Sequence, residues 1–215
     1  MPPPTAPTPE STGTAAAVPK APAARPRAPK AAAAAATALA CVQPLIRVRQ
    51  TREFTNQPVT KAELDAITEV ARWSGSSRNE QPCRFIALLD RVAISRIAEL
   101  GLPQTRGLPT ATAAVAIVVP DEPEREVSRA FDDGRAAERL LIAATLLGLG
   151  GGISRLRPDV REPIGQLLGL PPNRSVRTIV GFGHPTAEAL LPKSQPGAAR
   201  LAREQVIFAE RWPQR

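Results

Sequence analysis

The sequence predicts an α+β domain that occupies residues 43–215 of the 215-residue chain. Segments with helical periodicity and short apolar runs typical of strands are mixed here, without the regular strand–helix alternation of parallel sheets. No G-x-G-x-x-G pattern opens a helix after a strand, which argues against a dinucleotide-binding Rossmann unit. A domain of this length buries roughly 70% of its unfolded surface, which is enough for a single core.

The segment before this domain has a different composition. Residues 1–40 hold nine of the 24 prolines, many alanines, a single acidic residue and no aromatic residue. Such a segment cannot bury enough apolar surface to offset its chain entropy. We therefore expect residues 1–42 to be a disordered, Pro/Ala-rich extension. Alanines 31–36 could extend a frayed helix toward Leu39, since Ala is the best helix former.

The first half of the domain contains two helix patterns and one strand pattern. Thr60 and Glu63 form a capping box, and apolar residues at helical spacing follow them. Pro82 favours an extended conformation for the residue before it, ahead of an apolar stretch. In chain order we predict a short entry helix or turn over 45–52, a helix over 61–73, a strand over 84–89 and a helix over 93–100.

The second half is more apolar. Ala113–Val119 is a near-continuous apolar run bounded by Pro120, which predicts a central strand covered on both faces. The segment 136–149 is apolar nearly all round, so we expect a helix buried on more than one side, the second side by another subunit. The remaining predictions are a Gly/Pro/Thr-rich loop over 101–112, a helix over 159–170, a strand over 177–181 and a last helix over about 201–212.

Charge and cysteine content exclude several classes of function. The net charge is +8, but the arginines and lysines are spread out and aromatic residues are scarce, so a solvated basic surface is favoured over nucleic-acid binding. Two cysteines and one histidine are too few for a structural zinc site, and we predict no metal. No apolar run is long enough to span a membrane. The absence of a disulfide pattern favours the reducing cytoplasm.

Two stretches carry groups suited to a nucleotide-like ligand. Arg47, Arg49 and Arg52 place three guanidinium groups within six residues, and such groups match phosphate oxygens. The second stretch, 73–85, is a loop of small polar residues with an Asn and a Gln before a strand. Amide side chains offer both a donor and an acceptor to the edge of a heteroaromatic ring. A phosphate clamp with an amide-bearing loop is what a flavin mononucleotide (FMN) site requires.

These stretches, in this order, resemble the nitroreductase family of FMN-dependent oxidoreductases. The family opens with Arg-Arg-Ser-x-Arg-x-Phe, which resembles 47–54, and continues with Pro-Ser-x-x-Asn-x-Gln-Pro-Trp, which resembles 75–83. Two further matches are Asp133–Ala137, opening a helix that ends in Gly-Leu-Gly, and Arg200 ahead of the C-terminal segment. Together the matches cover about residues 43–212.

The resemblance implies a fold, a cofactor and partners. The fold would be a central, mostly antiparallel sheet wrapped by helices, in a homodimer with two flavin sites between its subunits. The protein would take a hydride from NADH or NADPH onto flavin N5 and pass electrons to a nitroaromatic, a quinone or a similar conjugated acceptor, in a ping-pong reaction. The flavin carries this chemistry, so we predict no catalytic side chain.

The resemblance also assigns flavin contacts. Arg49 and Arg52 would contact the phosphate and the ring edge, with Arg47 reaching in from one residue earlier. The turn carrying Asn79 would cover the flavin of the opposite subunit, and backbone groups after the glycine run would lie beside N5 and the pyrimidine edge. The full predicted set is Arg47, Arg49, Gln50, Arg52, Ser76, Ser77, Asn79, Gly151, Gly152, Ser154, Arg155, Leu156 and Arg200.

Other interpretations stay open at this point. The arginine-rich stretch could be an ordinary solvated turn, and the glycine run a flexible loop between helices. The same fold could perform a narrower flavin reaction, such as dehalogenation, ene reduction or flavin breakdown. A non-catalytic flavin-binding or partner-binding module is a further possibility, to which the departures from the family pattern at Val48, Gln50, Gly75 and Cys83 give weight.

Overall fold

The computed structural model describes residues 29–194 and 200–213. The chain divides into two compact units, Met1–Val42 and Gln43–Arg215. Helix α1 (Pro29–Ile46) is alanine-rich and crosses this boundary. The helix that alanines 31–36 were expected to extend toward Leu39 is present in this segment, in agreement with the helix preference of alanine. Residues 1–28, for which disorder was expected, lie outside the described part of the chain.

A four-stranded sheet forms the centre of the second unit. Its order is β1-β2-β4-β3, and every neighbouring pair is antiparallel, which confirms the predicted sheet. The central strand β2 is buried along nearly its whole length, as its unbroken apolar sequence predicts. The strands are β1 (Arg84–Leu88), β2 (Ala113–Pro120), β3 (Gly150–Arg155) and β4 (Arg174–Gly183).

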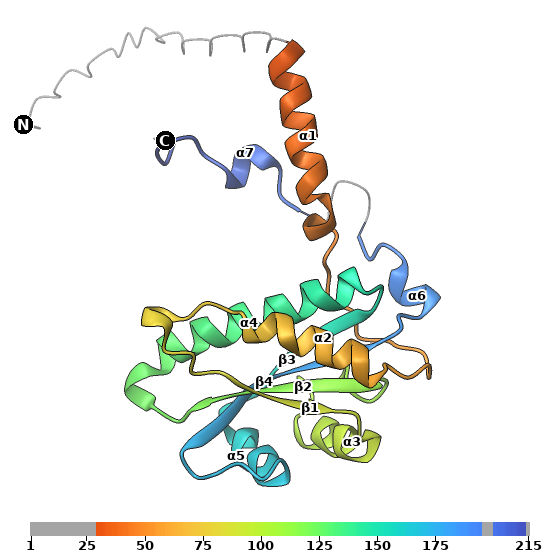
Figure 1. Cartoon of the computed structure of the whole chain (residues 1–215), viewed down its shortest axis with the longest axis vertical. Coiled ribbons are helices and arrows are strands. Elements are labelled where there is room, and N and C mark those ends of the chain that lie inside the picture. The colour runs from red at the N-terminus through yellow and green to blue at the C-terminus, as the bar shows by residue number, and fades with distance from the viewer. Residues whose placement is uncertain (1–28, 195–199, 214–215) are drawn as a thin grey trace, which may run out of the picture. The chain divides into compact units, whose positions relative to one another are not determined.

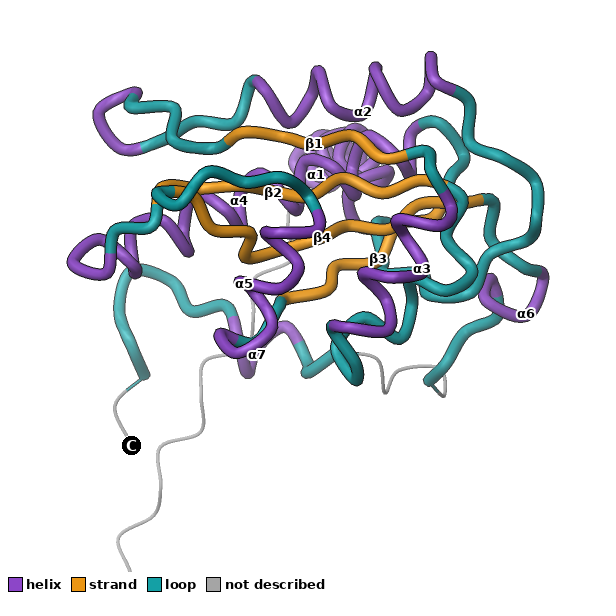
Figure 2. The backbone as a smooth tube through the Cα atoms, turned by 90° about the horizontal axis from the view of Figure 1, so that it is seen from below, coloured by secondary structure: helices purple, strands orange, loops and turns teal. Residues whose placement is uncertain are grey.

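Helices cover both faces of this sheet. Helices α2 (Lys61–Arg72) and α4 (Glu126–Leu146) lie on one face, and α3 (Arg91–Leu100) and α5 (Pro158–Leu167) on the other (Figures 1 and 2). Alternating residues of β2 supply the two cores, since Val115 packs with the first pair and Ala116 with the second. The fold is thus the predicted sheet wrapped by helices.

Helix α2 begins where its sequence predicts. Thr60 Oγ1 accepts the Glu63 N–H at 3.2 Å, and Glu63 Oε2 accepts the Thr60 N–H at 2.7 Å. This capping box fixes the first turn, and Leu64 and Ile67 then enter the core. Because α2 has 12 residues, its two ends are about 18 Å apart.

Helix α4 corrects the prediction for this segment. It begins at Glu126, ten residues before the predicted start, and runs through Gly134. Within this chain it is buried on one side, by residues such as Leu140 and Ala144. Val127, Phe131 and Leu146 are exposed. The expected burial of a second side by another subunit stays a prediction.

The glycine run and the C-terminal segment also differ from expectation. Residues 150–155 are strand β3 rather than a loop, because their backbone pairs along β4. The predicted last helix over about 201–212 is reduced to α7 (Arg203–Val206), and α6 (Ala187–Leu190) was not predicted. Two short 3₁₀ turns, η1 (Ser77–Asn79) and η2 (Pro123–Arg125), complete the fold. No helix in the described ranges is both long and apolar enough to cross a bilayer.

Candidate functional site

The arginine-rich stretch lies along the outer edge of β3. Gln50 forms a parallel bridge with Gly151, and the Thr51 N–H donates to the Gly151 carbonyl at 2.7 Å. The side-chain oxygen of Gln50 accepts both Arg52 Nη2, at 2.9 Å, and the Ile153 N–H, at 3.2 Å. Gln50 therefore joins the Arg52 guanidinium to the backbone of the edge strand. The sequence predicted both residues, but not this contact.

The glycines of β3 allow this close approach. A Cβ atom at Gly152 would lie 2.5 Å from the Thr51 carbonyl oxygen, and one at Gly150 would lie 2.9 Å from Thr51 Cβ. Real Cβ atoms do not come this close, so a larger residue would push the segment away. The glycines thus allow the chain's own residue Thr51 to lie close to β3. The predicted close approach to a ligand stays a prediction. Of the glycines in this run, Gly148 has a positive φ, of 74°.

The backbone beyond Gly151 presents alternate amides to the open edge. Gly151 and Ile153 make their contacts to residues 50–51, whereas the Leu156 N–H donates to the Arg177 carbonyl on β4 at 2.8 Å. Because the direction alternates along a strand, the backbone N–H of Arg155 faces the edge and that of Ser154 faces β4. Of the three predicted backbone contacts, Arg155 is therefore the one whose N–H faces the open edge of the sheet.

The loop over 101–112 joins this region, which sequence reasoning missed. A Cβ atom at Gly107 would lie 3.0 Å from both Cβ and Cγ of Arg52, so the loop backbone packs against the arginine stem. Thr110 Oγ1 donates to the Arg52 carbonyl at 3.4 Å. The buried Oε1 of Gln104 has no hydrogen-bond partner among the described residues. The only sequence signal was a dense cluster of Gly, Pro and Thr, which does not identify a ligand.

The turn after α2 holds the second predicted group. Ser76 Oγ accepts the Gln81 N–H at 2.8 Å, and Ser77 and Asn79 bound the 3₁₀ turn η1. Asn79 is exposed and has a positive φ of 55°. Asn tolerates this left-handed conformation better than most residues. The turn thus exposes Asn79 to solvent in a left-handed backbone conformation.

The two predicted groups lie at opposite ends of the sheet. Arg84, which follows the turn, pairs with Val118, whereas Gly151 pairs with Phe182 and, through it, with Ala113. Ala113 and Val118 are five residues apart, about 17 Å along a strand. The segments before and after α2 are correspondingly separated in two views of the chain (Figures 1 and 2). One chain therefore does not bring Asn79 and Arg52 to one ligand.

Arg47, Arg49 and Arg200 complete the predicted set. Arg49 Nη2 donates to the Leu190 carbonyl at 2.5 Å and to the Ala189 carbonyl at 3.4 Å. A guanidinium has five N–H donors, so these bonds leave capacity for a phosphate. Arg47 is exposed just after α1, and Arg200 is exposed directly after residues 195–199, which lie outside the described part. Their predicted phosphate contacts stay predictions.

Two titratable groups between the sheet and α4 have pKa values that burial raises. Burial, together with the nearby carboxylates of Asp133 and Asp132, raises the pKa of the Cys83 thiol to about 12. The thiolate is therefore absent at neutral pH. Burial also raises the pKa of Asp133, against the opposing effect of Thr178, whose hydroxyl donates to Asp133 at 2.7 Å.

Two hollows in the described part of the chain do not bring the predicted flavin contacts together. A groove of about 550 Å³ lies between α5 and the turn before β4. Its lining includes Arg161, Gln166 and Arg174, none of which is a predicted flavin residue. Ser76 lines a separate small cavity of about 30 Å³ beneath the turn after α2, which is too small for a flavin. The candidate site is an open edge rather than an enclosed pocket of this chain.

Comparison with known proteins gives consistent matches. The model of a family described as "Nitroreductase family" matches residues 47–184. A protein of Archaeoglobus fulgidus named "Putative NADH dehydrogenase/NAD(P)H nitroreductase" is 26% identical over 152 residues, covering 69% of this chain and 87% of that protein. The "NADPH-flavin oxidoreductase" of Vibrio harveyi is 27% identical over 157 residues, covering 67% of this chain and 65% of that protein.

A solved structure shares the fold. The crystal structure from Parabacteroides distasonis titled "Putative NADH dehydrogenase/NAD(P)H nitroreductase" aligns with a TM-score of 0.66 and 25% identity. The alignment covers 80% of this chain and 98% of the other. The similarity thus extends over almost all of that protein.

Proposed function

Since this chain belongs to the nitroreductase family, we propose that it is an FMN-dependent oxidoreductase that uses NADH or NADPH. The name of the Vibrio harveyi relative, an NADPH-flavin oxidoreductase, supports both the flavin and the nicotinamide donor. The observation that carries the proposal is the junction of Arg52, Gln50 and the Ile153 amide on the open edge of β3. It places a fixed cation beside outward-facing backbone amides.

The residues at this edge fit the chemistry of FMN. The cofactor has an anionic phosphate and a ring edge of alternating hydrogen-bond donors and acceptors. Arg49 and Arg52 supply guanidinium groups for the phosphate, with Arg47 and Arg200 as further candidates. The outward amide of Arg155 supplies a donor for the edge of a ring. When bound, FMN supplies the hydride and electron transfer, and these residues bind and orient it.

We propose that the complete site is built by two copies of the chain. Asn79 and its neighbours Ser76 and Ser77 lie at the opposite end of the sheet from Arg52, so one chain offers only one part of the site to each ligand. The exposed apolar residues of α4, such as Val127, Phe131 and Leu146, are suited to burial against a second copy. In such a homodimer the Asn79 turn of each chain would cover the flavin bound at the β3 edge of the other.

The substrates follow from the open edge. A single face above the flavin would receive the nicotinamide first and a planar, conjugated acceptor afterwards, which gives a ping-pong reaction. We propose nitroaromatics and quinones as the acceptor class.

A spectroscopic experiment tests this function. The purified chain mixed with FMN is expected to bind it, and NADPH under nitrogen should bleach the flavin absorbance, which then returns on adding a quinone. Arg52→Ala should raise the FMN dissociation constant by more than about tenfold, because it removes the cation held by Gln50. Arg96→Ala, an exposed arginine on α3, is the matched control and should bind FMN normally. A wild-type chain that binds no FMN would refute the function.

A non-catalytic flavin carrier is the second candidate, favoured by Gln50 and Cys83 at positions where the family pattern has Ser and Trp. The bleaching experiment separates the two. A bound flavin that NADPH and NADH both fail to reduce would identify a carrier.

A further inference from the structure

The turn that carries Asn79 has an unusual backbone. Arg78, Asn79 and Gln81 have φ values of 50°, 55° and 51°, in the left-handed region. Residues other than glycine adopt this region at a cost in free energy, and they do so where surrounding contacts hold them. Glu80 lies in the middle of this series. The contacts of the turn must therefore explain why it keeps this conformation.

Local contacts of the turn are two backbone hydrogen bonds and a few side-chain bonds near Gln81. The Asn79 N–H donates to the Ser76 carbonyl at 3.1 Å, and the Glu80 N–H donates to the Ser77 carbonyl at 3.0 Å. Ser76 Oγ accepts the Gln81 N–H at 2.8 Å, and Arg84 Nη1 donates to the Gln81 carbonyl at 2.7 Å. These bonds are exposed to solvent, and water competes with them. Asn79 itself takes part through its carbonyl, which accepts Gln81 Nε2 at 3.4 Å.

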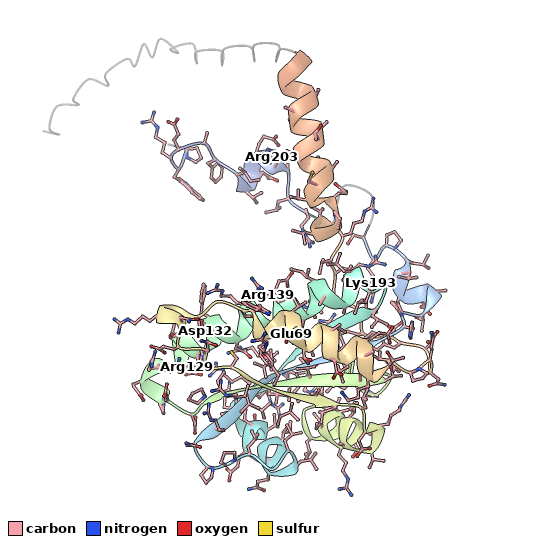
Figure 3. The ribbon with its side chains drawn as sticks, in the orientation of Figure 1. Glu69, Arg129, Asp132, Arg139, Lys193 and Arg203 are labelled. Atoms are coloured by element: carbon pink, nitrogen blue, oxygen red, sulfur yellow. The ribbon has the colours of Figure 1, made fainter. Side chains whose placement is uncertain are left out.

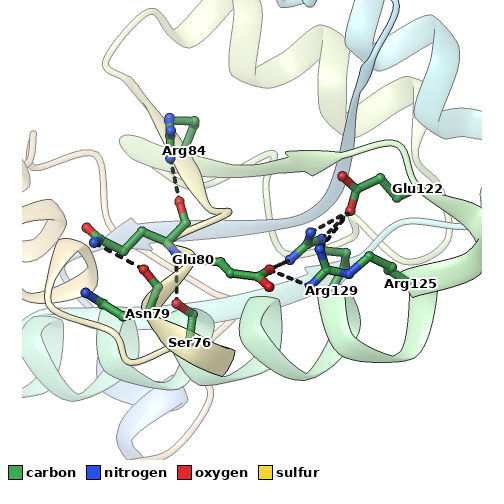
Figure 4. Close-up of polar contacts among 8 residues, drawn as sticks. Ser76, Asn79, Glu80, Arg84, Glu122, Arg125 and Arg129 are labelled. Carbon is green, nitrogen blue, oxygen red and sulfur yellow. Dashed lines mark hydrogen bonds and ion pairs between the residues drawn. The ribbon is translucent and has the colours of Figure 1, made fainter.

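The middle of the turn is attached to α4 by ion pairs. Glu80 Oε2 accepts Arg125 Nη2 at 2.5 Å and Arg129 Nη1 at 3.1 Å (Figure 4). Arg129 also donates to Glu122 Oε2, through Nη2 at 2.5 Å and Nε at 2.9 Å. These four residues, Glu80, Glu122, Arg125 and Arg129, form what we call the Arg129 cluster. It joins the turn, η2 and the first turns of α4.

Burial makes this cluster different from the surface ion pairs of the chain. The Arg129 side chain is 4% exposed, whereas Lys61 and Asp65, an ordinary pair on α2, are 77% and 58% exposed. A buried guanidinium needs its carboxylate partners, since an unpaired buried charge is costly. Arg129 therefore holds Glu80 in place from within the structure. Figure 3 shows Arg129 near the N-terminal end of α4, on the same side as the turn after α2.

We propose that Glu80 is a positioning residue, whose ion pairs with Arg129 and Arg125 fix the left-handed turn that presents Asn79 to a flavin. The inference rests on the proposed function for the flavin, and on the contacts above for the fixing of the turn. Glu80 itself touches neither flavin nor substrate in this scheme. Both arginines also lower the pKa of Glu80 below its ordinary value of 4.5, so it is charged at neutral pH.

Hydrogen–deuterium exchange of the flavin-free chain tests the fixing of the turn. Glu80→Gln should speed exchange in peptides covering residues 76–82 at least several-fold, and Glu80→Asp, which keeps the charge, should restore part of the protection. Asp65→Asn, which breaks the exposed pair with Lys61, is the matched control and should leave this region unchanged. If Glu80→Gln does not fold, Arg125→Gln takes its place. This variant removes one of the two ion pairs of Glu80 and leaves Arg129 paired with both carboxylates, and it should also speed exchange at 76–82.

FMN titration of the same variants tests the link to the cofactor. Glu80→Gln should raise the FMN dissociation constant by about tenfold and shift the visible spectrum of the bound flavin, and Glu80→Asp should recover part of both. Unchanged exchange at 76–82 in both Glu80→Gln and Arg125→Gln would overturn the proposal, and so would normal FMN binding by a loosened turn. A wild-type chain without FMN binding would instead refute the proposed function, while the exchange result would still stand.

Discussion

Arg52 donates a hydrogen bond from Nη2 to the side-chain oxygen of Gln50 at 2.9 Å. The same oxygen accepts the Ile153 N–H, so one glutamine holds both a cation and the edge of the sheet. In the family pattern a Ser occupies the position of Gln50. The longer side chain of Gln50 reaches both partners, so this departure from the family pattern adds two hydrogen bonds to the candidate site.

Replacing Gln50 by Leu should therefore weaken FMN binding. The variant loses the acceptor for Arg52 and Ile153, and a hydrogen bond to a charged group contributes about 1.5–3 kcal/mol. We expect the FMN dissociation constant to rise roughly tenfold or more in a fluorescence titration. Gln166→Leu, an exposed glutamine on α5, should leave it unchanged. Equal affinities for both variants would show that the Gln50 contact does not orient the site.

A methyl group at Gly152 should displace the arginine-rich segment. Gly152→Ala places a Cβ atom 2.5 Å from the Thr51 carbonyl, and this backbone atom cannot move without shifting residues 50–52. We expect overpacking to cost about 1–3 kcal/mol in urea unfolding, together with weaker FMN binding.

Gly134→Ala is the control for this substitution. Nothing lies within 4 Å of a Cβ atom at Gly134, in the middle of α4, so alanine should stabilise the fold by about 0.5–1 kcal/mol. If Gly152→Ala left both the free energy of unfolding and FMN binding unchanged, this would contradict the close approach of residues 50–52 to β3.

The two cysteines should react very differently. Cys41 is exposed, whereas burial and the nearby carboxylates raise the pKa of Cys83 to about 12. At pH 8 the native protein should show one reactive thiol per chain with Ellman's reagent, and a second after unfolding. The Cys41→Ser variant should then show none until it unfolds. A rapid reaction of Cys83 in the native variant would indicate an open site beneath the turn.

Removing the capping box should affect stability without affecting the flavin. Thr60→Ala deletes the hydroxyl that accepts the Glu63 N–H and should lower the free energy of unfolding by about 1 kcal/mol. Thr68 lies in the same helix and bonds only within it, to the Leu64 and Asp65 carbonyls. Thr68→Ala should be neutral or slightly stabilising. FMN affinity should be unchanged in both.

Local signals predicted the fold better than the site. The capping box at Thr60 and the apolar run of β2 depend on neighbouring residues, and both predictions were confirmed. For the glycines before Ser154 a strand was not predicted, because nothing local reveals that their backbone pairs with β4 or that Thr51 lies against Gly152. The Arg129 cluster was missed for the same reason, since Glu80 and Arg129 are 49 residues apart in sequence.

The separation of the arginine-rich segment from the Asn79 turn, by about the length of α2, has a consequence for mixed assemblies. If each site takes Arg52 from one chain and Asn79 from the other, an Arg52→Ala chain paired with an Asn79→Ala chain rebuilds one site that carries neither defect. The other site of that pair carries both. Hybrid dimers of the Arg52→Ala and Asn79→Ala chains, each of which binds FMN poorly by itself, would thus regain about half of the normal FMN content. A site completed within one chain would give no such recovery.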